Sequence, residues 1–228
     1  MSTRLHLPAR SRPAFERMAA DLRRVFGDRF VALVASGRHS SVAFATDILA
    51  GDLEALGPLV DVWQREDLES PLLLTPREFD RSLDAFPVEY QALLDHHEVI
   101  AGVPPFEGRV IDSDDLRRAC ETQAKSHVIH LRQGWIDSAG HETRLAGLLV
   151  RSAPALRALL TDVARLMAET APADPLDGAR LAGLDVDLVR SLIALEDDPA
   201  HAPQLVRRLP DYLAQSEYLW TALDTWRA

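Results

Sequence analysis

The chain changes its hydrophobic pattern once, at Pro104-Pro105. Before this point, short apolar runs alternate with helical patterns, whereas after it only the spacing of amphipathic helices remains. Alternating strands and helices are typical of an α/β domain, and a small number of short strands favours a mixed sheet over a large doubly wound one. We therefore predict a mixed-sheet α/β domain over residues 1–110 and an all-helical bundle domain over residues 111–228.

Local signals place the elements of the α/β half. Thr75-Pro76-Arg77-Glu78 is a capping box with proline at the first helical position, a pattern typical of a helix start. Asp52 is predicted to cap an earlier helix, because an N-cap carboxylate accepts hydrogen bonds from the first backbone N–H groups. The expected elements are helices over residues 11–26, 53–65, 78–85 and 88–95, and strands over residues 30–35, 42–46, 71–74 and 97–101.

In the helical half, apolar residues repeat at helical spacing over long stretches. Ser113 is predicted to cap a helix whose apolar stripe reaches Trp135, and Gly140 is expected to end it. Proline inside a helix removes a backbone hydrogen bond, so bends are expected at Pro154 and Pro210. Together with the helix from Ser113, helices are expected over residues 142–169, 186–195 and 202–226, with a loop over 171–178. Four helices with short links predict a bundle.

Charge and composition bear on partners and location. The net charge of −10 and the sequence pI of about 5.2 argue against a nucleic-acid partner. No apolar run reaches the roughly 18–20 residues of a membrane span, and residues 1–15 lack the apolar core of a secretory signal. We therefore predict a cytoplasmic protein without membrane contact. Cys120 is the only cysteine, which excludes an intramolecular disulfide and a cysteine-rich zinc site, and we expect it in the core.

One turn contains candidate phosphate-binding residues. The chain has neither G-x-x-x-x-G-K-[ST] nor G-x-G-x-x-G. The glycine that follows the first predicted strand is Gly37, within Ser36-Gly37-Arg38-His39. Arg38 and His39 could contact a phosphate, but a plain exposed turn would contain the same residue types. Ser36, Gly37, Arg38 and His39 are therefore the candidate cofactor-binding residues, although a plain turn is the favoured interpretation.

Three pairs or neighbours of histidine and cysteine are candidate metal ligands. His127 and His130 share a helix face and could bridge a metal ion, but Cys120 lies about 10 Å along the axis from His127, and no third ligand is evident. Two polar residues at the edge of a packed helix are the favoured interpretation. His96-His97-Glu98 offers at most one histidine and no H-E-x-x-H pattern. No metal site is predicted.

Several stretches carry a family resemblance. Residues 71–79 (PLLLTPREF) and 81–90 (RSLDAFPVEY), followed by Leu116-Arg117 and residues 131–135 (LRQGW), resemble a group of bacterial nucleotidyltransferase-like proteins. The resemblance covers most of the chain from about residue 20. It implies a polymerase-β-type nucleotidyltransferase domain followed by a helical bundle, the architecture of antibiotic nucleotidyltransferases.

The chain departs from that family at its catalytic motif. The family ends its first strand with Gly-Ser, and it carries D-x-D on the next strand and a third acid on a later one, where these carboxylates hold two Mg²⁺ ions. Here Ser36-Gly37 stands in reversed order, and the predicted strands over 42–46 and 71–74 contain no acid. No catalytic residue therefore carries over, and no cofactor is expected.

Two hypotheses about function follow. In the first, a catalytically degenerate nucleotidyltransferase fold serves as a binding or interaction protein for an unidentified protein or small molecule. In the second, the chain is an active Mg²⁺-dependent nucleotidyltransferase that modifies a small molecule, a tRNA or a protein. Its cofactors would be Mg²⁺ and a nucleoside triphosphate, with acids drawn from Asp47, Asp52, Glu54 or Asp61. We favour the first, because without the carboxylates nothing holds the metal ions or stabilises the developing charge.

A third hypothesis concerns the helical half alone. Tyr212, Tyr218, Trp220 and Trp226 form an aromatic group near the end of the sequence. Aromatic residues are enriched at protein interfaces, so the bundle could form a homodimer through them. The same residues would equally be ordinary members of a core.

Overall fold

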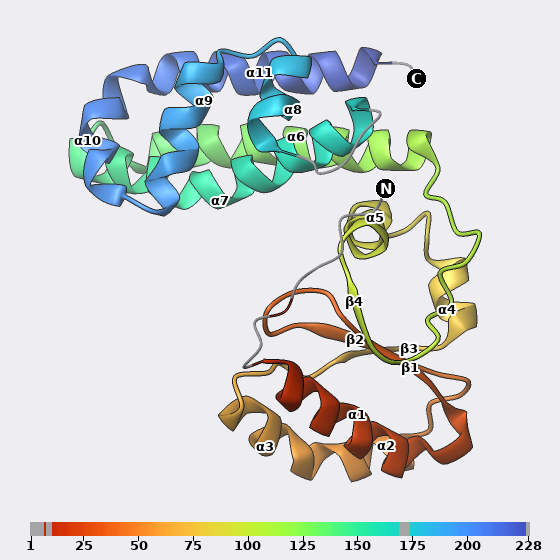
Figure 1. Ribbon diagram of the computed structural model, residues 1–228. Helices are drawn as coiled ribbons and strands as arrows, with labels where there is room; N and C mark the ends of the chain where they lie inside the picture. The colour runs from red at the N-terminus through yellow and green to blue at the C-terminus, as the bar shows by residue number, and fades with distance from the viewer. Residues whose placement is uncertain (1–6, 8–10, 169–173, 227–228) are drawn as a thin grey trace. The chain divides into compact units, whose positions relative to one another are not determined.

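The computed structural model describes residue 7, residues 11–168 and residues 174–226. The chain forms two compact units that divide between Ile111 and Asp112. The first is an α/β unit with one mixed sheet, and the second is a helical unit (Figure 1). The predicted mixed α/β architecture followed by a C-terminal helical region is confirmed.

The α/β unit is built around a four-stranded sheet of order β3-β2-β1-β4. Strand β1 pairs antiparallel with β2 and β4, and β2 pairs parallel with β3. The elements are α1 (Arg12–Phe26), η1 (Gly27–Arg29), β1 (Phe30–Ala35), β2 (Ser41–Ala45), α2 (Ala50–Leu56), η2 (Gly57–Leu59), α3 (Val60–Arg65), β3 (Leu72–Leu74), α4 (Pro76–Arg81), α5 (Pro87–Asp95) and β4 (Glu98–Gly102).

Helices cover both faces of this sheet (Figure 1). On one face, α1 to α3 pack on alternate strand residues, including Leu33 and Ala43. On the other face, Phe44 of β2 meets the ring of Phe79 from α4 edge to face, and Tyr90 of α5 packs on Phe79. All five residues of β2 are buried as a result.

Two helix starts in the α/β unit test the capping predictions. The capping box is confirmed, since the Glu78 backbone N–H donates to Thr75 Oγ1 (3.1 Å) and the Thr75 N–H donates to Glu78 Oε2 (2.8 Å). The prediction that Asp52 is an N-cap is wrong. Helix α2 begins at Ala50, and Asp52 is its third residue, where its carboxylate accepts from the Leu49 N–H at 2.8 Å. The predicted helix over 53–65 is also interrupted by η2, which contains proline.

The helical unit contains two long helices joined by a short turn. Helices α6 and α7 form an antiparallel pair, α11 lies along α6, and α8 and α9 pack on α7 (Figure 1). The elements are α6 (Ser113–Asp137), α7 (Glu142–Met167), α8 (Pro175–Leu181), α9 (Val186–Ile193), η3 (Ala194–Glu196), η4 (Pro199–His201), α10 (Ala202–Leu205), η5 (Val206–Arg208) and α11 (Leu209–Thr225).

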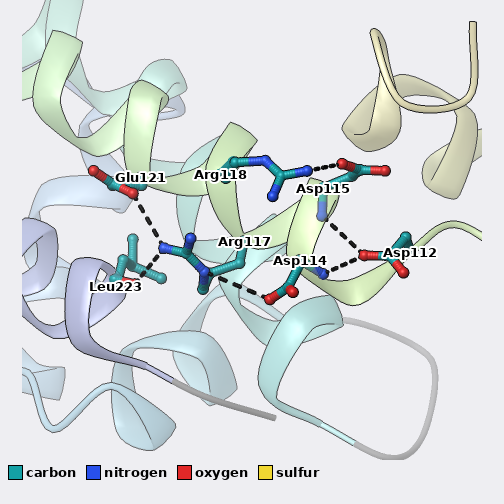
Figure 2. A network of polar contacts seen from close by, with 7 residues as sticks. All are labelled: Asp112, Asp114, Asp115, Arg117, Arg118, Glu121 and Leu223. Atoms are coloured by element: carbon teal, nitrogen blue, oxygen red, sulfur yellow. Dashed lines mark hydrogen bonds and ion pairs between the residues drawn. The ribbon is translucent and has the colours of Figure 1, made fainter.

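Helix α6 begins in a network of charged residues (Figure 2). The predicted cap, Ser113, is wrong by one residue, because the Asp112 carboxylate accepts from the N–H groups of Asp114 (2.8 Å) and Asp115 (3.3 Å). Arg117 then donates through Nη1 to Glu121 (3.1 Å) and to the carbonyl oxygen of Leu223 (3.3 Å). A carbonyl in the last turn of α11 thereby gains a cationic partner, which ties α11 to α6.

Three further expectations for the helical unit are settled in part. The predicted helix over 202–226 is present as α10 and α11, but the 3-10 turn η5 interrupts it just before Pro210. Pro210 itself lies in the first turn of α11, where no backbone N–H is needed. Pro154 lies inside α7, as predicted. The predicted loop over 171–178 falls partly on residues 169–173, outside the described residues, and its remainder begins α8, capped by Asp174. In the part of the chain that the structure describes, no helix is both long and apolar enough to cross a membrane.

Candidate functional site

The four candidate phosphate-binding residues lie together in the turn between β1 and β2. The Ser36 N–H donates to the Ser40 carbonyl at 3.0 Å, and His39 Nδ1–H donates to the Asp67 carbonyl oxygen at 2.6 Å. The turn is therefore closed on itself and fastened to a neighbouring loop. Arg38 is exposed and has no hydrogen bond or ion pair to a described residue. It is the group in this turn that remains available to a phosphate.

Two of the candidate acids of the second hypothesis, Asp47 and Asp52, lie near the same arginine, because Arg29 donates to the Asp52 carboxylate and also to the Asp47 carbonyl oxygen at 3.3 Å. Asp52 is 7% exposed, and both of its oxygens accept from Arg29, at 2.6 and 2.7 Å. Asp47 follows β2 and is exposed, as are Glu54 on α2 and Asp61 on α3. Among the described residues, no three histidine, cysteine or acidic side chains come together in a way that could hold a metal ion.

The Arg29–Asp52 pair makes one prediction about pH. Bonding to the Arg29 guanidinium, and then to the Leu49 N–H, lowers the pKa of Asp52 from its usual 3.8 to about 2. A carboxyl group with a lowered folded-state pKa stabilises the fold above its unfolded-state pKa, and it loses this effect as pH falls. We expect the gap in unfolding temperature between the native chain and Asp52→Asn to be full above about pH 4 and to narrow towards about pH 2.

Thermal unfolding monitored by circular dichroism between about pH 2 and pH 6 measures this gap. Asp61→Asn is the matched control, since Asp61 is exposed and has no ion pair with a described residue. A gap for Asp52→Asn that stays constant over the whole range would contradict the assignment.

The helical unit contains a buried chain of hydrogen bonds. His127 Nε2 lies 2.7 Å from Tyr212 Oη, Tyr212 Oη donates to Ser152 Oγ at 3.2 Å, and Ser152 Oγ donates to the Leu149 carbonyl at 2.9 Å. With the last two donors assigned in this way, the first bond requires the proton on His127 Nε2. Burial, and then the nearby His130, lower the pKa of His127 to about 4, so the ring is neutral at pH 7.

A hollow of about 860 Å³ lies beside this chain, along the seam between α6 and α7. Most of its wall area is apolar, although more than half of its lining residues have polar side chains, His127, Ser152 and Arg151 among them. A concave, mainly apolar site of this volume with a few polar groups is typical of small-molecule sites. This seam is therefore the candidate functional site in the described chain.

The two histidines and the cysteine of α6 differ in burial and in hydrogen-bond partners. His130 is exposed, and its Nδ1–H donates to the Ser126 carbonyl at 2.7 Å, whereas His127 is directed to Tyr212. Cys120 is completely buried, as expected, and burial raises the pKa of its thiol to about 12. His127 and His130 both line the hollow, but as a buried donor to Tyr212 and a surface group rather than as a matched pair.

Sequence reasoning missed the partners of His127. The sequence predicts Tyr212 as a core or interface aromatic, and it gives no prediction for Ser152 or Arg151. The hydrogen bonds of Tyr212 to His127 and to Ser152 join residues that are 85 and 60 positions apart in the sequence, so no local sequence pattern predicts them. The available signal was the set of small residues where the two longest helices face one another. No family model, curated protein or solved structure matches the chain.

Proposed function

We propose that this protein is a binding protein built on a nucleotidyltransferase-like α/β domain that has lost catalysis. The resemblance of residues 71–90 supports the ancestry. A β1–β2 hairpin followed by a parallel β3 is compatible with such a domain. In this proposal, no Mg²⁺ or nucleoside triphosphate is needed for function.

The main support for the proposal is that strand β2 is fully buried and contains no acidic residue. The D-x-D motif of the family belongs on this strand, where one sheet face must be open to metal and triphosphate. Here Ser41–Ala45 has no acid, every residue is buried, and Phe44 is packed in the aromatic cluster under α4. The nearest buried acid, Asp52, has both oxygens engaged by Arg29. Without free carboxylates, the charge of two Mg²⁺ ions and a leaving pyrophosphate has no partner.

We expect no transfer of nucleotide. The protein is incubated with each α-³²P-labelled ribonucleoside triphosphate and Mg²⁺, with bulk tRNA, aminoglycosides or no acceptor, beside an active nucleotidyltransferase as positive control. Label above the level of an EDTA-treated sample, in any acceptor or in the protein itself, would overturn the proposal in favour of an active transferase. Asp47→Asn and Glu54→Gln would then identify the acids involved.

A further inference from the structure

The hollow between α6 and α7 is long and narrow. Its lining on α6 extends from Thr122 to Asp137, which is about 20 Å at roughly 1.5 Å per residue. Small side chains leave the space open, among them Ser126 on α6 and Ala155 and Ala158 on α7. Leucines line the apolar wall. The shape suits an extended or flat apolar body of drug-like size better than a whole helix, which is about 10 Å wide.

One end of the hollow carries two arginines and one carboxylate, since Asp137 lines both this hollow and the adjoining one beside Arg151. Arg151 lines it and also lines an adjoining hollow of about 360 Å³, together with Arg144. Neither arginine forms a hydrogen bond or an ion pair with a described residue. The other arginines of the described helical unit, apart from Arg207, have carboxylate partners. Arg144 and Arg151 are therefore two guanidinium groups without carboxylate partners that line one hollow.

The other polar groups that line the hollow add little charge away from the Arg151 end. Asp137 is the one carboxylate in its lining, and it accepts from Gln133 Nε2 at 2.9 Å. The buried ring of His127 is neutral, so it adds no charge at the floor. With its proton directed to Tyr212, His127 Nδ1 is an acceptor without a bond to a described residue. Among the described residues, the Arg151 end therefore carries two guanidinium groups, Arg151 and Arg144, against one carboxylate, Asp137, and its net charge is positive.

We propose that the α6–α7 seam binds an amphipathic organic anion, with its apolar body along the leucines and its carboxylate or sulfonate group against Arg151. An arginine fork pairs with a planar carboxylate through two hydrogen bonds, which fixes the orientation of the ligand. This inference goes beyond the proposed function and does not depend on the ancestry of the α/β unit. A positive transferase assay would leave it standing, and its own failure would leave the loss of catalysis untouched.

Binding is tested on the full chain with 8-anilino-1-naphthalenesulfonate as a fluorescent anionic probe. Decanoate, decan-1-ol and decyltrimethylammonium, which share an alkyl chain and differ in head group, then compete for the site. We expect saturable binding of one probe molecule, with displacement by decanoate at concentrations about tenfold or more below those needed for the other two. No saturable binding at millimolar probe, or equal displacement by all three competitors, would overturn the proposal.

Two variants locate the site. Arg151→Gln is expected to weaken decanoate about tenfold while leaving decan-1-ol unchanged, and Ala155→Phe is expected to abolish binding of both by filling the seam. Arg207→Gln and Ala214→Phe are matched controls on exposed residues outside the hollow. Unchanged decanoate affinity in Arg151→Gln contradicts the orientation. If Ala155→Phe alters the far-UV circular dichroism, Ala158→Leu is used in its place. Unchanged decanoate binding in whichever of these two variants is folded would show that the ligand binds elsewhere.

Discussion

Phe79→Ala is expected to lower the free energy of unfolding of the α/β unit by about 3–5 kcal/mol. Phe79 is completely buried, and its ring contacts three others, with centroids 5.7 Å from Phe44, 4.8 Å from Tyr90 and 5.4 Å from Phe106. Truncation removes these contacts and leaves a cavity between α4, α5 and the sheet. Flanking strands and helices cannot close it without moving their backbones.

Urea unfolding followed by hydrogen exchange and mass spectrometry measures this loss, because peptides from each unit are read separately. Phe86→Ala is the matched control. Phe86 is 52% exposed and meets the same cluster only through Tyr90, so its replacement is expected to cost about 1 kcal/mol or less. Equal losses for the two variants would show that the ring cluster is not a tightly packed core.

Gly178→Ala is expected to destabilise the helical unit by about 3 kcal/mol, near the upper end for overpacking. Alanine is ordinarily favoured over glycine in a helix by about 1 kcal/mol, so the expected sign is opposite to that of propensity. A Cβ on Gly178 would lie 2.0 Å from the Leu160 carbonyl oxygen and 3.1 Å from the Ala164 nitrogen. Both atoms belong to the α7 backbone, and no rotamer change relieves the overlap, so α8 must move away from α7.

Gly147→Ala provides the control within α7. A Cβ there would approach only the flexible end of Arg151, at 3.1 Å. This variant is expected to be neutral or stabilising by up to about 1 kcal/mol. Thermal unfolding of both variants, read from peptides of the helical unit, distinguishes the two cases. Stabilisation by Gly178→Ala would mean that α8 and α7 are not in backbone contact.

Local sequence patterns predicted the elements whose determinants are local. The run Phe30–Ala35 forms β1 because an apolar, β-branched stretch suits a strand covered on both faces, and the Thr75–Glu78 capping box starts α4 because both partners lie within one turn. Caps that rest on a single acid were placed less well. Asp52 serves as the third helical residue because Arg29, 23 residues earlier, holds its other lone pairs.

Features that depend on distant residues could not be read from the sequence. The chain of hydrogen bonds from His127 through Tyr212 to Ser152 joins three helices, α6, α11 and α7. The seam hollow was also out of reach, because a run of small residues in a helix predicts close packing as readily as an open groove. Its charge depends on which arginines have carboxylate partners in the folded chain, and several of those partners are distant in sequence.

The burial of Cys120 makes its rate of reaction with a thiol reagent a measure of how often the helical unit opens. A thiol reagent reacts with the thiolate, and with a pKa near 12 in the folded state this sulfur reacts only when α6 opens to solvent. Because the chain has no second cysteine, the labelling rate of the unaltered protein reports the opening of the helical unit alone. A ligand bound in the seam should lower the labelling rate of Cys120 in proportion to its occupancy, and the measurement needs neither a mutation nor an attached dye.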